Sequence, residues 1–270
     1  MKKIFLVLLT FLSVINSYGQ LGKESFESGK EKDLQKDYKG AIEDYTKAIE
    51  QNPDMMPAYN NRGVAKEKLE DFEGAIADYT KAIKIDGKSD TSPYYNRALL
   101  KFKQKDYKGA IEDYTKVVDL NPKDGEAFFR RGVARRKLSN NTEALSDFNK
   151  AIEIETNFEK GYLNRANTKE SLQDFKGAID DYTRVIQLNP TYFEAYSFRG
   201  LLKNKTKDYT GAIEDFNKVI EINPSYSDAY YNRGLSNIAI SQKEPGCIDL
   251  NKALELGLAK ASEMIKKYCN

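Results

Sequence analysis

The sequence predicts an all-α protein, a solenoid of about seven helix-turn-helix repeats, and two observations carry this prediction. Within the stretch DYKGAIEDYTKAI (37–49), apolar residues fall at i, i+1, i+4, i+7 and i+8, which is the stripe of a helix and not the alternation of a strand. The same stretch returns at intervals of 34 or 35 residues, starting at Asp71, Asp106, Asn140 (a looser copy), Asp174 and Asp208. Self-similarity at a fixed period is the signature of repeat architectures, whose units cannot bury their apolar stripes alone.

The first residues stand apart from the repeats. A basic start (Lys2 and Lys3) precedes an apolar run over residues 4–15 and then the small and polar residues NSYGQ. The run is too short to cross a bilayer core, which needs ~20 residues. The pattern is typical of a cleavable secretory signal peptide over residues 1–19. We therefore expect an exported protein, periplasmic or secreted, that begins at Gln20 and has no stable membrane insertion. The alternative is an uncleaved start that anchors the chain.

A second recurring stretch precedes each repeated helix after the first. It reads PAYNNRGVAK from Pro57 and SPYYNRALLK from Ser92, and it places an aromatic residue four positions before a Gly or Ala. Spacing of four puts both residues on one helix face, where the small residue lets a partner helix approach closely. The pairs are Tyr59/Gly63, Tyr94/Ala98, Phe128/Gly132, Tyr162/Ala166, Tyr196/Gly200 and Tyr230/Gly234.

The second helix of each repeat carries the complementary pattern, an Ala four residues before an aromatic, as in Ala41/Tyr45 and Ala75/Tyr79. Together the two patterns resemble the tetratricopeptide repeat over about residues 22–260. The resemblance implies a right-handed α-solenoid with repeats near 22–55, 56–90, 91–124, 125–158, 159–192, 193–226 and 227–258. Terminal repeats are often atypical, and the last one has Pro245-Gly246 and Leu250 in place of the pattern. After Gly257, the stretch AKASEMIKKYC predicts a C-terminal capping helix within 259–270.

The composition argues against catalysis and against nucleic-acid binding. The chain has no histidine, which removes the usual general base and the commonest metal ligand. Two cysteines cannot form a zinc site alone, and no glycine-rich phosphate loop is visible, so we expect no cofactor, no metal site and no enzyme. Without residues 1–19 the chain is electrically neutral, because the signal carries two of the 43 basic residues and there are 41 acidic ones. The basic footprint of a nucleic-acid partner is missing.

An arginine and an aspartate sixteen residues later recur in six repeats. One interpretation is a row of arginines that binds anions. We favour an Arg–Asp pair between the two helices of each repeat, worth ~0–1 kcal/mol if exposed. The pairs are Arg62/Asp78, Arg97/Asp113, Arg131/Asp147, Arg165/Asp181, Arg199/Asp215 and Arg233/Asp249.

The resemblance also implies a partner-binding groove, because the first helices of tetratricopeptide repeats line the concave face and hold extended peptides or partner helices. Asparagine offers donors and acceptors to an extended backbone, and apolar residues offer anchors, unless they only pack between repeats. Lys103, Arg136 and Lys137 would favour acidic ligands. The candidate groove residues are Asn60, Asn61, Tyr95, Asn96, Leu99, Phe129, Arg130, Val133, Leu163, Asn164 and Asn167, and Ser197, Phe198 and Leu201 continue the row.

The two cysteines, Cys247 and Cys269, are expected to form a disulfide. An exported chain meets oxidising conditions, where paired cysteines are common. Cys247 lies ten residues before Gly257 and Cys269 twelve after it, so the two lie at similar heights in an antiparallel hairpin. The alternative is two buried thiols in a helix interface.

These observations favour a non-catalytic protein–protein interaction scaffold that binds a peptide segment or a partner helix in its groove. A structural subunit of a cell-envelope assembly is the alternative from another class, and an enzyme is the least favoured. Repeat folds host many roles, so the sequence does not identify the partner.

Overall fold

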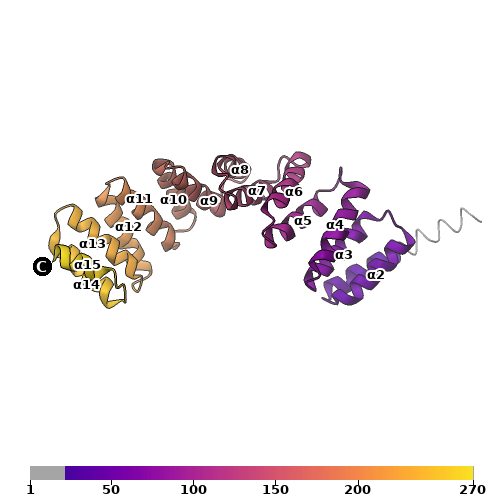
Figure 1. Cartoon of the computed structure of the whole chain (residues 1–270), viewed down its shortest axis with the longest axis horizontal. Helices are drawn as coiled ribbons and strands as arrows, with labels where there is room; N and C mark the ends of the chain where they lie inside the picture. The colour runs from indigo at the N-terminus through magenta and orange to yellow at the C-terminus, as the bar shows by residue number, and fades with distance from the viewer. Residues whose placement is uncertain (1–21, 270) are drawn as a thin grey trace, which may run out of the picture. The chain divides into compact units, whose positions relative to one another are not determined.

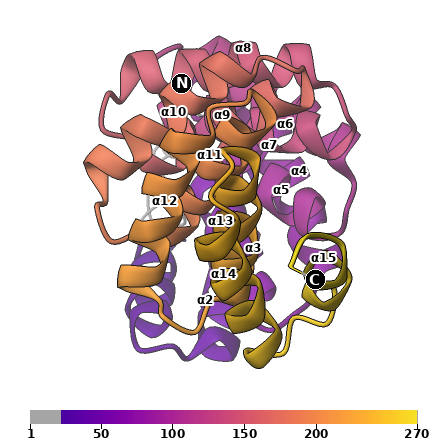
Figure 2. The ribbon, with the colours of Figure 1, turned by 90° about the vertical axis from the view of Figure 1, so that its left-hand side faces the viewer.

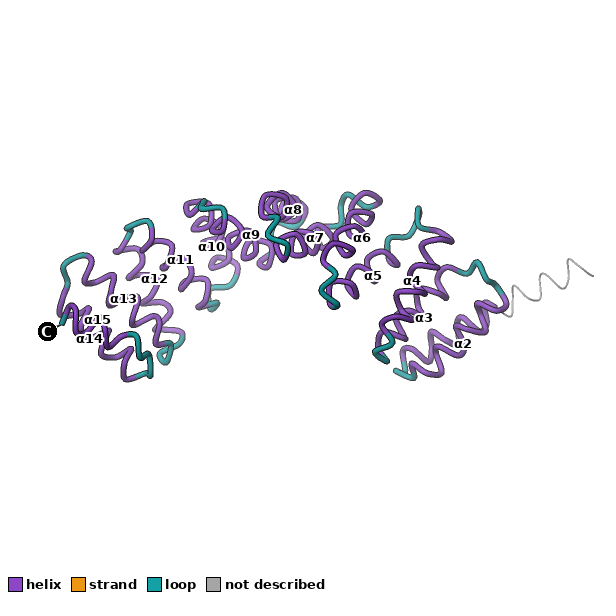
Figure 3. Tube along the Cα trace, viewed as in Figure 1, coloured by secondary structure: helices purple, strands orange, loops and turns teal. Residues whose placement is uncertain are grey.

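The computed structural model describes residues 22–269, and regular structure there is entirely helical (Figures 1 and 3). The predicted signal peptide, residues 1–19, lies outside the described residues. No helix within residues 22–269 is both long enough and apolar enough to cross a membrane.

The chain divides into two compact units, Met1–Leu138 and Ser139–Asn270. In the first unit a helix over residues 22–34 precedes α2 (Tyr38–Gln51), α3 (Met56–Lys68), α4 (Phe72–Asp86), α5 (Ser92–Lys103), α6 (Tyr107–Leu120) and α7 (Gly125–Lys137). The second unit holds α8 (Asn141–Ile154), α9 (Glu159–Ser171), α10 (Phe175–Leu188), α11 (Phe193–Lys205), α12 (Tyr209–Ile222), α13 (Ser227–Ala239), α14 (Lys243–Glu255) and α15 (Ala261–Tyr268). Within each unit, consecutive helices pack against each other. The predicted all-α solenoid of helix-turn-helix repeats is confirmed.

The turn within each repeat explains why the motif begins with Asp and has Gly three residues later. The Asp106 side chain caps α6 by accepting a hydrogen bond from the Gly109 backbone N–H at 3.0 Å. A Cβ on Gly109 would overlap the Asp106 carboxylate, so glycine suits this position. Lys105, just before the cap, has a left-handed φ of 64°, and the Asp106 N–H closes the end of α5 on the Lys101 carbonyl at 2.9 Å. One short turn therefore ends the first helix and starts the second.

Close helix contact depends on the small residue that recurs in the first helix of each repeat. Tyr79 of α4 is fully buried. A Cβ on Gly63 of α3 would lie only 2.7 Å from Tyr79 Cε1, well inside contact distance. The sequence-based expectation that the small residue lets a partner helix approach is confirmed, and the group that fills the space is the aromatic residue of the second helix.

The recurring arginine joins three helices. Arg97 of α5 makes two bonds to Asp113 of α6, Nε to Oδ2 at 2.8 Å and Nη2 to Oδ1 at 2.6 Å. Its Nη1 donates to the Thr80 hydroxyl of α4, in the preceding repeat, at 2.9 Å. Lys101 Nζ lies 2.9 Å from the same carboxylate, whose side chain is only 4% exposed. The expected pairing is confirmed for this and four further pairs, Arg62/Asp78, Arg165/Asp181, Arg199/Asp215 and Arg233/Asp249. The pairs are more buried than the exposed pairs for which we expected little stabilisation.

In the first repeat, the aspartate equivalent to Asp113 is Asp44, and residues other than arginine bind it. Ser28 stands where later repeats carry the arginine, and its hydroxyl donates to Asp44 Oδ2 at 2.7 Å. Lys32 Nζ lies 2.6 Å from Oδ2, and Lys47 Nζ lies 3.0 Å from Oδ1. Burial alone would raise the pKa of Asp44, but the bonds from Lys32, Ser28 and Lys47 outweigh it and lower the pKa to about 2.

Asp44 should therefore make stability depend on pH in the acid range. Its pKa of about 2 lies below the ~3.9 of an unfolded aspartate. The ionised carboxylate stabilises the folded chain by about 2 kcal/mol above pH ~4, and this contribution should fade as the pH falls through about 2. We expect the difference in unfolding free energy between the natural chain and Asp44→Asn to shrink between pH ~6 and ~2. A difference that stays constant over this range would show that the charge of Asp44 is not its source.

The last helix is fastened to the last repeat by a disulfide. At the C-terminal end of the second unit, α15 packs against α14 (Figure 2). Cys247, in α14, and Cys269, directly after α15, have Cα atoms 5.7 Å apart and Sγ atoms 1.99 Å apart. A Cα separation of this size is ordinary for a disulfide. The geometry agrees with the pairing that the spacing around Gly257 predicts.

Thiol counting tests the disulfide in the purified protein. The chain unfolded without reductant should expose no reactive thiol, and reduction should expose both cysteines. Two reactive thiols per chain before reduction would rule the bond out.

Candidate partner-binding groove

The predicted groove residues lie on the first helix of each repeat, and the structure links several of them across neighbouring repeats of the first unit. Asn96 Nδ2 of α5 donates to Asn60 Oδ1 of α3 at 3.1 Å, and Asn60 Nδ2 reaches Asn61 Oδ1 at 3.3 Å. All three side chains are half-buried. The amides thus form a chain along this face.

Arg130 of α7 continues this row and contacts the predicted groove residue Tyr95 of α5. Its Nε donates to the Tyr95 hydroxyl at 2.8 Å, and its Nη2 lies 2.6 Å from Glu126 Oε1. The Cζ atom lies 6.0 Å from the centre of the Tyr95 ring, within the range of a cation–π contact. Burial raises the pKa of Tyr95, with Glu126 adding to the effect and Arg130 opposing it, so the hydroxyl is protonated at neutral pH.

Phe129 is a correction to the predicted groove. Its side chain is only 9% exposed, so it belongs to the core and is not available as an anchor for a partner. Ser197 is 4% exposed and, like Phe129, directly follows the recurring aromatic residue of its helix. Tyr95, at the same position of α5, is half-buried, so burial at this position differs from repeat to repeat. Leu99 and Leu163 also pack against buried clusters, while Val133 is half-buried.

In the second unit the same face is less polar. Asn164 Nδ2 donates to the Lys160 carbonyl at 2.9 Å, and Asn167 Oδ1 accepts from the Tyr182 hydroxyl at 2.6 Å, so Asn167 is held by its own repeat. Phe198 and Leu201 of α11 are 39% and 40% exposed. Four other repeats have asparagine where α11 has Phe198, so the second unit presents an aromatic side chain at an amide position.

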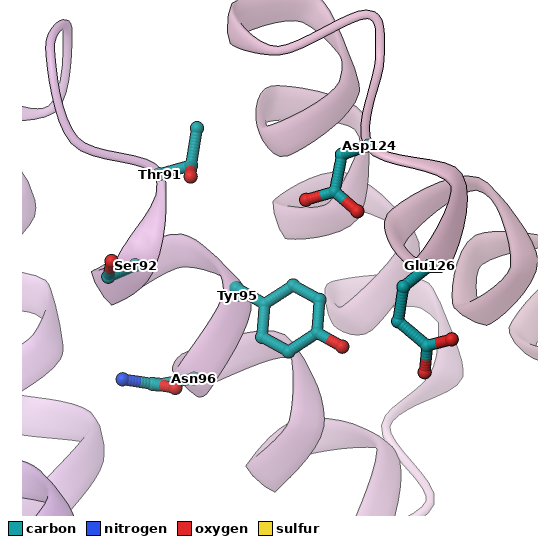
Figure 4. Close-up of a pocket in the computed structure, with 6 residues that line it drawn as sticks. All are labelled: Thr91, Ser92, Tyr95, Asn96, Asp124 and Glu126. Carbon is teal, nitrogen blue, oxygen red and sulfur yellow. The ribbon is translucent and has the colours of Figure 1, made fainter. Parts of the chain in front are cut away.

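A pocket opens beside Tyr95, between the starts of α5 and α7 (Figure 4). Its volume is ≈ 320 Å³, and it is lined by Thr91, Ser92, Tyr95, Asn96, Asp124 and Glu126. The sequence-based search found Tyr95 and Asn96 and missed the other four. Asp124 and Glu126 stand at the start of the first helix of the fourth repeat, directly after an Asn-Pro helix end, and this position is the signal that could have found them.

The basic residues expected to favour acidic ligands are not among the residues that line this pocket. Lys103 Nζ instead lies 4.5 Å from the centre of the Phe72 ring. Arg136 also interacts with other residues of the protein. Residues 22–269 contain no group of three or more Asp, Glu, Cys or His side chains that could hold a metal ion.

Comparison with known proteins agrees with this architecture. Models described as "Tetratricopeptide repeat" match residues 26–55, 57–89, 92–124, 125–158 and 159–192, and a model described as "TPR repeat" matches 200–239, together well over half of the chain. No curated protein matches the chain.

Among solved structures, the crystal structure of MamA protein is 26% identical, with a TM-score of 0.59, over 67% of this chain and 96% of that one. A tetratricopeptide repeat protein from Parabacteroides merdae is 23% identical (TM-score 0.61, 93% of this chain and all of that one). The C-terminal part of a TPR repeat-containing protein from Cytophaga hutchinsonii is 17% identical (TM-score 0.74, 88% and 98%). The last two similarities are evidence for the fold alone. With the family models matching most of its repeats, the chain belongs to the tetratricopeptide repeat family.

Proposed function

We propose that the protein is a non-catalytic scaffold that binds a polypeptide segment on the face formed by the first helices of its repeats. The observation that carries this proposal is the row of half-buried amide and apolar side chains on that face, which ends at a pocket beside Tyr95. Amides can bond an extended backbone in both directions, and pockets beside them select side chains. The family supports the proposal, because tetratricopeptide repeat proteins are generally interaction scaffolds.

Panning a displayed library of random peptides against the mature chain tests this function. The variant Phe198→Asn should lose peptides that place an apolar side chain on α11, with little change in melting temperature, because four other repeats carry asparagine there. Ile222→Asn is the matched control, since Ile222 is 38% exposed and lies on a second helix of the same unit. No recovered peptide, or equal loss in both variants, would contradict binding at this face.

A structural subunit of a cell-envelope assembly is the second candidate, and one observation favours it. Ile248 of α14 is 64% exposed, at a position that is polar in most other repeats, and it borders a pocket of ≈ 370 Å³ with Ile213 and Pro245. A permanent partner could cover this patch. Aggregation of the purified chain that Ile248→Glu abolishes would favour this role, whereas a monodisperse natural chain would not.

Export is part of the proposal. The basic start and short apolar run of residues 1–19 support it, and so does the pairing geometry of Cys247 and Cys269, since disulfides persist in oxidising compartments. A fusion that carries residues 1–25 should deliver a reporter across the inner membrane, and the mature protein should begin at Gln20. Recovery of the mature chain in the cytoplasm with Met1 intact would rule export out.

A further inference from the structure

The charged residues that line the pocket between α5 and α7 are all acidic. Asp124 and Glu126 are the only ionised side chains among its six lining residues. The other four contribute the hydroxyls of Thr91, Ser92 and Tyr95 and the amide of Asn96. In Figure 4 the Tyr95 ring lies between the carboxylates of Asp124 and Glu126 on one side and Ser92 and Asn96 on the other.

Several hydrogen-bond acceptors of the pocket are left over. One oxygen of Asp124 caps α7 by accepting from the Ala127 N–H at 2.9 Å, and Glu126 Oε1 meets Arg130 at 2.6 Å. The second oxygen of each carboxylate lies outside these two contacts. Asn96 uses its amide N–H on Asn60, so its carbonyl oxygen remains for a ligand. Two anionic acceptors, one amide oxygen and three hydroxyls suit a ligand group that is cationic and rich in donors.

The protein places a guanidinium of its own at the edge of this pocket. Arg130 donates to the Tyr95 hydroxyl, pairs with Glu126 and lies within cation–π range of the Tyr95 ring. Two of the lining residues are thus already arranged for planar, multi-donor contact with a guanidinium. Lysine offers only a point charge, whereas the five N–H donors of arginine form a rigid fork that also stacks on aromatic rings.

We infer that this pocket binds an arginine side chain of the partner polypeptide, with the guanidinium beside Tyr95 and facing Asp124, Glu126 and the Asn96 carbonyl. The inference rests on the proposed function, which supplies the polypeptide that carries the arginine. It reverses the sequence-based expectation of acidic ligands. Arg130 neutralises part of the charge of Glu126, so Asp124 is the principal anion for the ligand.

Nuclear magnetic resonance of the mature full chain can test this with Nα-acetyl-argininamide as the probe. The probe should shift the backbone amide signals of residues 91–96 and 124–127. Nα-acetyl-citrullinamide has nearly the same shape without the charge and should bind at least ~10-fold more weakly, as expected for loss of a charge-assisted contact. Asp124→Asn should weaken arginine binding by a similar factor, because asparagine still caps the helix and only the charge is lost.

Asp106→Asn is the matched control, since Asp106 caps α6 in the same way and is not a lining residue of the pocket. It should leave arginine binding unchanged. Four outcomes would each overturn the inference. The arginine and citrulline probes could bind equally, or Nα-acetyl-glutamate amide could bind more tightly. The signals of residues 91–96 and 124–127 could stay unshifted, or the two variants could have equal effects. Peptides that bind the helix face without any enrichment of arginine would overturn it while the proposed function stands. Arginine binding without any recovered peptide would overturn the proposed function instead.

Discussion

Replacing Arg97 with methionine should lower the free energy of unfolding by about 3 kcal/mol, one of the two largest effects we expect in this protein. The substitution removes both bonds from α5 to Asp113 of α6 and the bond from α5 to Thr80 of α4. Asp113 would remain buried, with a side chain 4% exposed and Lys101 as its remaining cation. Loss of one partner of a buried pair is costly because the other charge stays desolvated.

Urea unfolding followed by circular dichroism, fitted with a nearest-neighbour repeat model, measures this effect. The control is Lys150→Met, which breaks a pair with Glu153 whose side chains are 44% and 69% exposed. An exposed pair of this kind is worth ~0–1 kcal/mol, so the control should change little. Equal losses in the two variants would show that the Arg–Asp pairs stabilise no more than surface pairs do.

The parts of the fold that depend on local pattern could be predicted from the sequence. Helix stripes, small residues opposite aromatics and the Arg–Asp spacing all recur, and each recurrence repeats the same local geometry. The Asp-x-x-Gly spacing of Asp106 and Gly109 also indicates a helix cap and the space that the cap needs, although repetition alone does not reveal this role. Ser28 stands in place of the arginine in the first repeat, and only the structure shows that its hydroxyl bonds Asp44 there.

The candidate site was less predictable because it depends on how neighbouring repeats stack. Tyr95 and Asn96 were found by their position on the first helix, but Asp124 and Glu126 come from the next repeat and face them only after packing. Adjacent positions of a first helix also differ in exposure. Phe198 is 39% exposed, whereas Phe129, one position earlier in its own helix, is 9% exposed. A rotation of one residue moves a side chain by about 100° around the helix, so spacing alone separates these cases poorly.

The burial of Phe129 leads to the second large effect. Phe129→Ala should destabilise the protein by about 3 kcal/mol, because truncating a buried phenylalanine loses its apolar burial and leaves a cavity. Its neighbour gives a matched comparison. Arg130 has a side chain 41% exposed, and Arg130→Asn introduces the residue that four other repeats carry at this position, so stability should change by no more than ~0.5 kcal/mol.

The pair of variants separates core from groove on adjacent residues of α7. If Phe129→Ala unfolds at the urea concentration of the natural chain, the side chain is not part of the core, and the original assignment of Phe129 to the groove is restored. If Arg130→Asn is the more destabilising change, the bonds of Arg130 to Tyr95 and Glu126 hold the repeats together. The face beside Tyr95 would then be a structural contact, because its polar groups would be needed by the fold and could not be spared for a ligand.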